Sequence, residues 1–68
     1  MPYARNEDLP PAVRNHLPEH AQDIFREAFL NAWREYAGDP RREEIAFRVA
    51  WAAVKRSYLR QDGLWRHR

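Results

Sequence analysis

Between Pro18 and Gly38 the chain has its longest regular alternation of apolar and polar residues. The apolar positions recur every three or four residues, at Ala21, Ile24, Phe25, Ala28, Phe29, Ala32, Trp33 and Tyr36. This spacing places them on one face of an α-helix whose opposite face is polar. Proline suits the first position of a helix, and glycine suits a left-handed cap after its end. The pattern therefore predicts a helix over 18–38.

A second amphipathic pattern predicts a helix from Pro40 to about Leu59, with Asp39 as its cap. Its apolar positions form two adjacent stripes that cover more than half of the circumference: Ala46, Val49, Ala50, Ala53, Val54 and Ser57, and then Phe47, Trp51, Val54 and Tyr58. We expect so apolar a helix to lie centrally in the fold. The link to the preceding helix is only about two or three residues, and such a link produces an antiparallel or steeply crossed helical hairpin.

Proline also marks a shorter helical segment near the start of the chain. Asp8 can cap it, and Pro10 and Pro11 suit its first turn, so about two turns are expected, with Val13 and Leu17 directed inward. Residues 1–7 form a lead-in, and residues 61–68 form an irregular basic tail that turns at 62–63. The sequence therefore predicts an all-α single domain over 1–68, in which the short N-terminal helix docks on a two-helix hairpin.

Composition is compatible with such a domain. The chain has 68 residues and no cysteine, which excludes disulfides and thiolate metal sites. Three Trp, three Tyr and three Phe are then the main source of buried area. We expect the core to include Phe29, Trp33, Tyr36, Phe47, Val49, Trp51, Val54 and Tyr58.

Charge is unevenly distributed along the chain. Residues 1–54 carry seven Arg and nine Asp or Glu, a net charge of −2, whereas residues 55–68 carry five cations and one Asp, a net charge of +4. No run approaches the roughly 20 apolar residues that a bilayer-spanning helix needs, and the N-terminus lacks the apolar block of a signal peptide. We therefore expect a cytoplasmic protein without membrane insertion.

The residues that usually carry catalysis are scarce. Ser57 is the only serine, threonine is absent, and the two glycines have turn positions rather than a phosphate-binding loop. We predict that the protein is not an enzyme and holds no cofactor or metal. His16 and His20 are four residues apart but are separated by Pro18, and Glu43 and Glu44 suit a helix start. A cation sensor built on either pair remains a third hypothesis.

Several short motifs are specific in combination. They are Asp8-Leu9-Pro10, Leu17-Pro18, His20-Ala21-Gln22, Ala28-Phe29, Ala32-Trp33, Arg42-Glu43-Glu44 and Val49-Ala50-Trp51-Ala52-Ala53-Val54-Lys55 with Tyr58, after the opening Met1-Pro2-Tyr3. The chain resembles the ChaB family of small bacterial proteins. The resemblance implies a regulator that contacts a calcium/sodium–proton antiporter or a related regulator, and it brings no catalytic residue. Relatives joined to Rho-type nucleic-acid-binding modules imply that a nucleic-acid role is also open.

Two sets of residues are candidates for binding. Leu30 is the one apolar residue on the polar face of the first long helix, and this chain has it where the family usually has a polar residue. With its neighbours Arg26 and Arg34 it forms the candidate protein-binding surface. The alternative is a nucleic-acid accessory module, because cations bind phosphates and aromatic rings stack on bases. Its candidate residues are Lys55, Arg56, Arg60, Trp65, Arg66 and Arg68.

Overall fold

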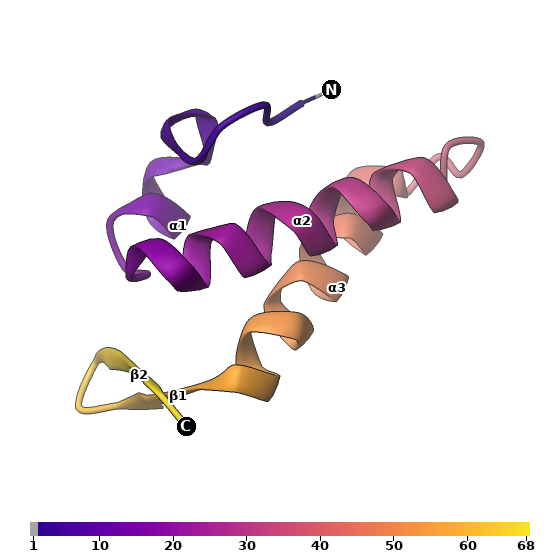
Figure 1. Ribbon diagram of the computed structural model, residues 1–68. Helices are drawn as coiled ribbons and strands as arrows, with labels where there is room; N and C mark the ends of the chain where they lie inside the picture. Colours follow the sequence, from indigo (N-terminus) through magenta and orange to yellow (C-terminus); the bar gives the residue numbers. More distant parts are fainter. Residues whose placement is uncertain (1) are drawn as a thin grey trace.

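The computed structural model describes residues 2–68 and places two long helices side by side with shorter elements at one end (Figure 1). In chain order the elements are a 3-10 turn η1 (Asn6–Asp8), α1 (Pro11–Arg14), α2 (Glu19–Glu35), α3 (Arg42–Ser57), β1 (Tyr58–Gln61) and β2 (Leu64–His67). The helix α3 runs back along α2 and diverges from it toward the N-terminal end of α2. There α1 and the two strands lie on different sides of the α2 helix.

The core is built from aromatic rings on α2 and small residues on α3. Phe25 and Phe29 are 0% and 1% exposed, and their ring centroids lie 6.0 and 5.0 Å from that of Phe47. Three α3 residues are 0% exposed: Ala46, Ala50 and Val54. Their small side chains at four-residue spacing let the backbone of α3 approach the rings of α2. The predicted helical hairpin is thus present, with α3 as its second arm.

Two members of the predicted core are misplaced. Tyr36 is 36% exposed and Val49 is 39% exposed, while Trp33, Phe47 and Trp51 are half-buried against the core. Tyr36 is exposed because α2 ends at Glu35. Val49 is exposed because α3 turns its Phe47 and Trp51 flank toward α2. Phe29, Val54 and Tyr58 are buried, as the sequence predicts.

The link between the long helices differs from the expected one. It spans residues 36–41, and Gly38 does not have the left-handed backbone predicted for a cap. Tyr36 has the C-cap position, with φ −104° and ψ 33°. The predicted cap and helix start are also wrong, because α3 begins at Arg42 with Arg41 at its N-cap. The carboxylate of Asp39 accepts a hydrogen bond from the backbone N–H of Arg41 at 2.7 Å, within the turn before the helix.

The prediction of a purely all-α fold with an irregular tail is wrong. The chain leaves the helix after Ser57 and forms an antiparallel pair in which Tyr58 faces His67 and Arg60 faces Trp65. Asp62 and Gly63 make the two-residue turn with φ values of +54° and +79°. Asp-Gly is a favoured pair for such a turn, because both positions need positive φ and the resulting twist matches that of the strands.

The N-terminal segment also differs in detail. The carboxylate of Asp8 accepts a hydrogen bond from the backbone N–H of Arg5 at 3.2 Å, so it closes η1 instead of capping α1. α1 has only four residues and Pro10 at its N-cap. Val13 and Leu17 are buried as predicted, at 3% and 5% exposure. Met1 of the family-like opening lies outside the described residues. Within residues 2–68, no helix is long and apolar enough to cross a membrane.

Candidate functional site

The three residues predicted to bind a protein do gather at one place on α2. Leu30, Arg26 and Arg34 line a surface hollow of about 520 Å³, here called the α2 hollow. Its other lining residues are Asp23, Glu27 and Asn31, so cations and carboxylates alternate around it. The hollow is polar, and it offers both charge signs to a partner.

The expectation that Leu30 exposes an apolar side chain is wrong. Leu30 is 7% exposed and belongs to the buried cluster. The helical period of α2 alone makes this flank polar, but the lead-in segment lies along it. Tyr3 packs on Phe29 with ring centroids 4.9 Å apart. The period of one helix cannot show that another segment lies across it.

Arg26 is the side chain that fastens the lead-in to α2. Its Nε donates to Asn6 Oδ1 at 2.8 Å, and its Nη1 donates to the carbonyl oxygen of Ala4 at 3.0 Å. Asn6 in turn donates to Asp23 Oδ1 at 2.6 Å. Arg34 is exposed, and its guanidinium contacts Asn31 of the same helix. Of the three predicted residues, Arg34 is therefore the one most available to a partner.

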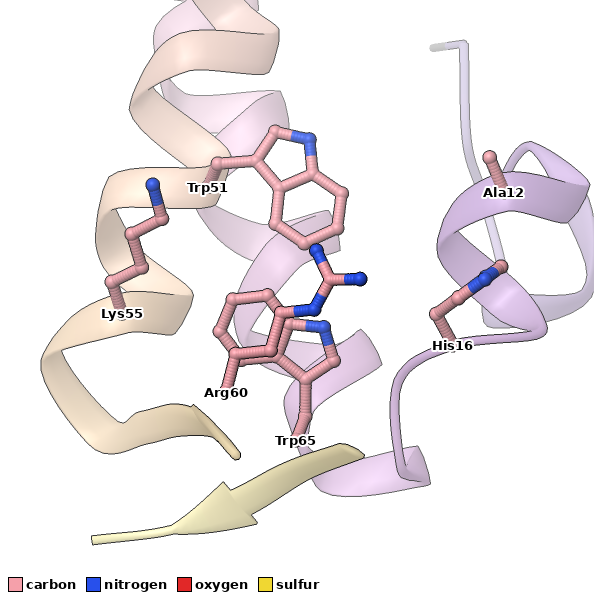
Figure 2. A pocket seen from close by; sticks show the side chains of 6 residues that line it. All are labelled: Ala12, His16, Trp51, Lys55, Arg60 and Trp65. Carbon is pink, nitrogen blue, oxygen red and sulfur yellow. The ribbon is translucent and has the colours of Figure 1, made fainter. Parts of the chain in front are cut away.

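Three of the six residues predicted to bind nucleic acid meet at a second hollow, of about 370 Å³, here called the C-terminal hollow (Figure 2). They are Lys55, Arg60 and Trp65, and they are joined by Trp51, His16 and Ala12. Figure 2 shows the two indoles and the guanidinium of Arg60 on one side, with Ala12 of α1 and His16, which follows α1, on the other. The helix α3, the strands and α1 all contribute to this hollow.

Stacking positions the aromatic wall of the C-terminal hollow. The rings of Trp51 and Trp65 lie 5.7 Å apart at an interplanar angle of 26°. Trp51 is in turn fixed by the edge of Phe25, at 5.1 Å between centroids. Arg60 is the cross-strand partner of Trp65, so both side chains project from the same face of the hairpin. The folding of the strands therefore brings Arg60 and Trp65 to α3.

The electrostatics of the C-terminal hollow differ from those of the α2 hollow. No carboxylate lines it, whereas Lys55 and Arg60 do. Ion pairs within residues 2–68 join Arg5 to Glu7 and both Arg41 and Arg48 to Glu44, so neither lining cation takes part in one. The hollow combines positive charge with aromatic surface.

The other three predicted nucleic-acid residues lie outside this hollow. Arg56 and Arg66 are exposed, and Arg66 faces Leu59 across the strands. Arg68 donates from its backbone N–H to Ser57 O at 2.8 Å and from Nε to Lys55 O at 3.0 Å. It thereby ties the end of the chain to the end of α3. The six residues form a basic end of the molecule rather than a single site.

Sequence reasoning missed the role of His67. Its ring stacks on that of His20 at 5.9 Å and meets the ring of Tyr58 edge-on at 4.9 Å. His20 Nδ1 also lies 3.0 Å from the hydroxyl oxygen of Tyr58. This cluster fastens the strands to the start of α2. The alternation of Tyr58, Arg60, Trp65 and His67 around Asp-Gly was the signal that could have revealed it.

The residue pairs of the cation-sensor hypothesis have other partners. His16 lines the C-terminal hollow, whereas His20 contacts Tyr58. Arg41 lowers the pKa of Glu44 through hydrogen bonds and charge, and Arg48 adds a smaller effect. Among residues 2–68 no three His, Cys, Asp or Glu side chains are grouped as a metal ion would require.

Comparison with known proteins shows which family has this architecture. A family model described as ChaB matches residues 9–68. The chain belongs to the ChaB family. Two curated relatives, from Escherichia coli (strain K12) and Shigella flexneri, are each 50% identical to it over 68 residues, covering 91% of this chain and 90% of theirs. Both are named "Putative cation transport regulator ChaB". The family resemblance inferred from the sequence is confirmed.

A solved ChaB structure has the same fold. The "NMR solution structure of the putative cation transport regulator ChaB" matches with a TM-score of 0.87 at 47% identity, covering 98% of this chain and 99% of that one. So extensive a match takes in the C-terminal strands as well as the helices. The β-hairpin is therefore part of the ChaB-like architecture of this chain.

Proposed function

We propose that this protein is a non-catalytic regulator of cation transport that acts on the cytoplasmic side through contact with a protein, a cation–proton antiporter or a related regulator. The regulatory role is supported by the name of relatives that are 50% identical over 91% of the chain. The antiporter is the partner that the family resemblance implies. Action through a binding surface, rather than through catalysis, is supported by the structural roles of several polar side chains.

Three of the side chains that could serve acid–base chemistry are engaged in holding the fold. His20 contacts Tyr58, Asp23 accepts from Asn6, and Glu44 is paired with two arginines. Each of these groups stabilises a junction between segments or a helix start. These structural roles favour a protein that acts by binding a partner over one that acts by catalysis.

The observation that carries the proposed contact is the gathering of Arg26, Leu30 and Arg34 at the α2 hollow. Arg34 is exposed there beside Glu27 and Asn31. A partner with complementary charges can pair with these side chains, which sets specificity and register more than raw affinity. Arg26 lines the same hollow and also holds the lead-in on α2.

The test is antiport measured in membrane vesicles that contain a cation–proton antiporter, with this protein added. We expect the wild-type chain to change the rate of cation–proton exchange and Arg34→Glu to lose most of that effect. Arg56→Glu, which makes the same charge change on an exposed position of α3, is the matched control and should retain it. No effect of the wild-type protein, or equal loss in both variants, would contradict the proposal.

The alternative function is a nucleic-acid-binding accessory module. It is favoured by one specific observation, the C-terminal hollow in which Lys55, Arg60 and Trp65 meet without a carboxylate. Such binding should weaken steeply with salt, because each phosphate contact releases counterions. If a variant without Lys55 and Arg60 still modulated antiport, then antiporter regulation and nucleic-acid binding would belong to different surfaces.

A further inference from the structure

The C-terminal hollow brings together two chemical features. One is a half-buried indole pair, Trp51 and Trp65, stacked at 5.7 Å. The other is a pair of cations, Lys55 and Arg60, that take part in none of the ion pairs within residues 2–68. Aromatic surface beside unpaired cations is complementary to a ligand that joins a planar ring to a negatively charged group.

We propose that the C-terminal hollow binds one nucleotide unit, with the heteroaromatic base against the indole wall and the phosphate on Lys55 and Arg60. This inference rests on the nucleic-acid alternative and locates its site. Base stacking on aromatic side chains tolerates any base, because every base has a π-face. The site therefore fits a nucleotide unit without sequence preference.

The shape of the hollow suits a ligand of this size. Its volume of about 370 Å³ lies near the lower end of ligand pockets, which run from roughly 300 to 1,000 Å³. Ala12 of α1 and His16, just after this helix, form the wall opposite the indoles (Figure 2). A flat ring can enter between α1 and the indoles, while the flexible side chains of Lys55 and Arg60 reach the phosphate. Larger ligands would extend out of the hollow.

The α2 hollow lacks this complementarity. It is larger, about 520 Å³, but it has no aromatic lining residue, and it includes the carboxylates of Asp23 and Glu27. A phosphate placed there would meet negative charge. The α2 hollow is therefore a useful comparison site: it has two arginines, but it lacks the indole wall and contains carboxylates.

The test uses tryptophan fluorescence in a Trp33→Phe background. Trp33 lies away from the hollow, near Arg42, so the remaining emission comes from Trp51 and Trp65. The probes are an eight-nucleotide single-stranded DNA, a mononucleotide and inorganic tripolyphosphate, each titrated at low and high salt. We expect the oligonucleotide to quench the emission and to bind at least about 10-fold more tightly than tripolyphosphate, since the latter has no ring to stack.

Variants separate the site from general charge. The double variant K55Q/R60Q should lose about 10-fold or more in affinity, and the slope of log affinity against log salt should fall by about 0.7 per phosphate contact removed. The control R34Q/R48Q makes the same change of net charge on exposed positions away from the hollow and should bind as the background does. Trp65→Leu, checked by helical circular dichroism, should lose a comparable factor.

The outcomes are distinguishable. A mononucleotide that binds as tightly as the oligonucleotide identifies a free nucleotide as the ligand, and preference for the oligonucleotide identifies a single strand; both support the site. Tripolyphosphate binding equal to that of the oligonucleotide would overturn it. Unchanged binding by K55Q/R60Q would overturn the site but leave a nucleic-acid role to Arg56 and Arg66. No binding by any probe at low salt would remove both the site and the nucleic-acid alternative.

Discussion

The α2–α3 pair and the β-hairpin are held by different means. In the helical pair, fully buried residues of both helices interlock, with Phe25, Ala46, Ala50 and Val54 at 0% exposure. In the hairpin, one face docks through Tyr58, Trp65 and His67, while the other leaves Leu59 and Leu64 at 38% and 59% exposure. A two-stranded sheet of this kind is marginal by itself, so its position depends on a few aromatic contacts.

This difference means that one region contributes most of the stability and the other contributes residues of the candidate binding site. The helical pair supplies most of the buried area and should carry most of the free energy of folding. The hairpin supplies Arg60 and Trp65 to the C-terminal hollow, and it can loosen while the helices remain folded. Free energies of local opening commonly differ in this way between a core and its docked elements.

The largest effect is expected from Phe25→Ala, which removes a ring that contacts Phe29, Phe47 and Trp51. Truncation of a buried Phe costs about 3–5 kcal/mol. A chain of this length has only about 3–10 kcal/mol of total stability. We therefore expect the variant to be largely unfolded by circular dichroism at room temperature. Tyr36→Ala is the control, and a cooperative transition at the wild-type temperature in Phe25→Ala would contradict the core assignment.

The hairpin is next tested by Gly63→Ala. A side chain at φ +79° costs about 1 kcal/mol, although no atom lies within 4 Å of the added Cβ. The strands should therefore lose protection while the helical signal is retained. Gly38→Ala is the matched control, because its Cβ also meets nothing within 4 Å and its backbone is not left-handed. Chemical shifts of the strand amides measure the difference, and equal behaviour of both variants would refute the turn geometry.

A smaller effect is expected from Tyr58→Phe, which keeps the ring and removes the hydroxyl that lies 3.0 Å from His20 Nδ1. Loss of one such hydrogen bond costs about 0.5–1.5 kcal/mol. Thermal unfolding should show a small decrease in midpoint. Chemical shifts of His20 and His67 should change with it, and unchanged histidine shifts would show that the contact does not hold the strands.

The smallest effect concerns Glu44 at the start of α3. Its pKa is lowered in the folded chain, first by hydrogen bonding to Arg41 and then by the charges of Arg41 and Arg48. A lowered folded-state pKa adds stability above the ordinary value of 4.5, and this stability is lost as pH falls through the lowered pKa. Because the group is exposed, the change is small. Glu44→Gln should flatten the acid limb of stability against pH slightly, and a steeper limb would contradict the ion pair.

The helices could be predicted from the sequence because each has its own apolar period. The positions of Phe25, Ala50 and Val54 follow from that period and from the proline boundaries. The strands have only four residues each, and the helical period of α3 continues in the sequence to Tyr58. The contrary signals were the Asp62-Gly63 turn and the short alternation on either side of it. Tyr58 is buried in either arrangement, which hid the change of structure.

The sequence indicated several residues of the candidate sites, but it did not indicate how they are arranged. The cations near the C-terminus and Trp65 were evident, but Trp51 and His16 join them only because the hairpin turns Trp65 back against Trp51 of α3, across the hollow from His16. Leu30 was misjudged for the same kind of reason. The lead-in is fastened to the neighbouring Arg26 and Phe29, and no local pattern encodes those contacts.

The most direct test of the separation between core and hairpin is native-state hydrogen exchange of backbone amides at low denaturant. The amides of Phe25, Phe29 and Ala50 should exchange only through global unfolding. Those of the hydrogen-bonded strand pair Leu59 and Arg66 should exchange at least about 10-fold faster, with little dependence on denaturant. Strand amides that match the helical amides in both protection and denaturant dependence would contradict the account.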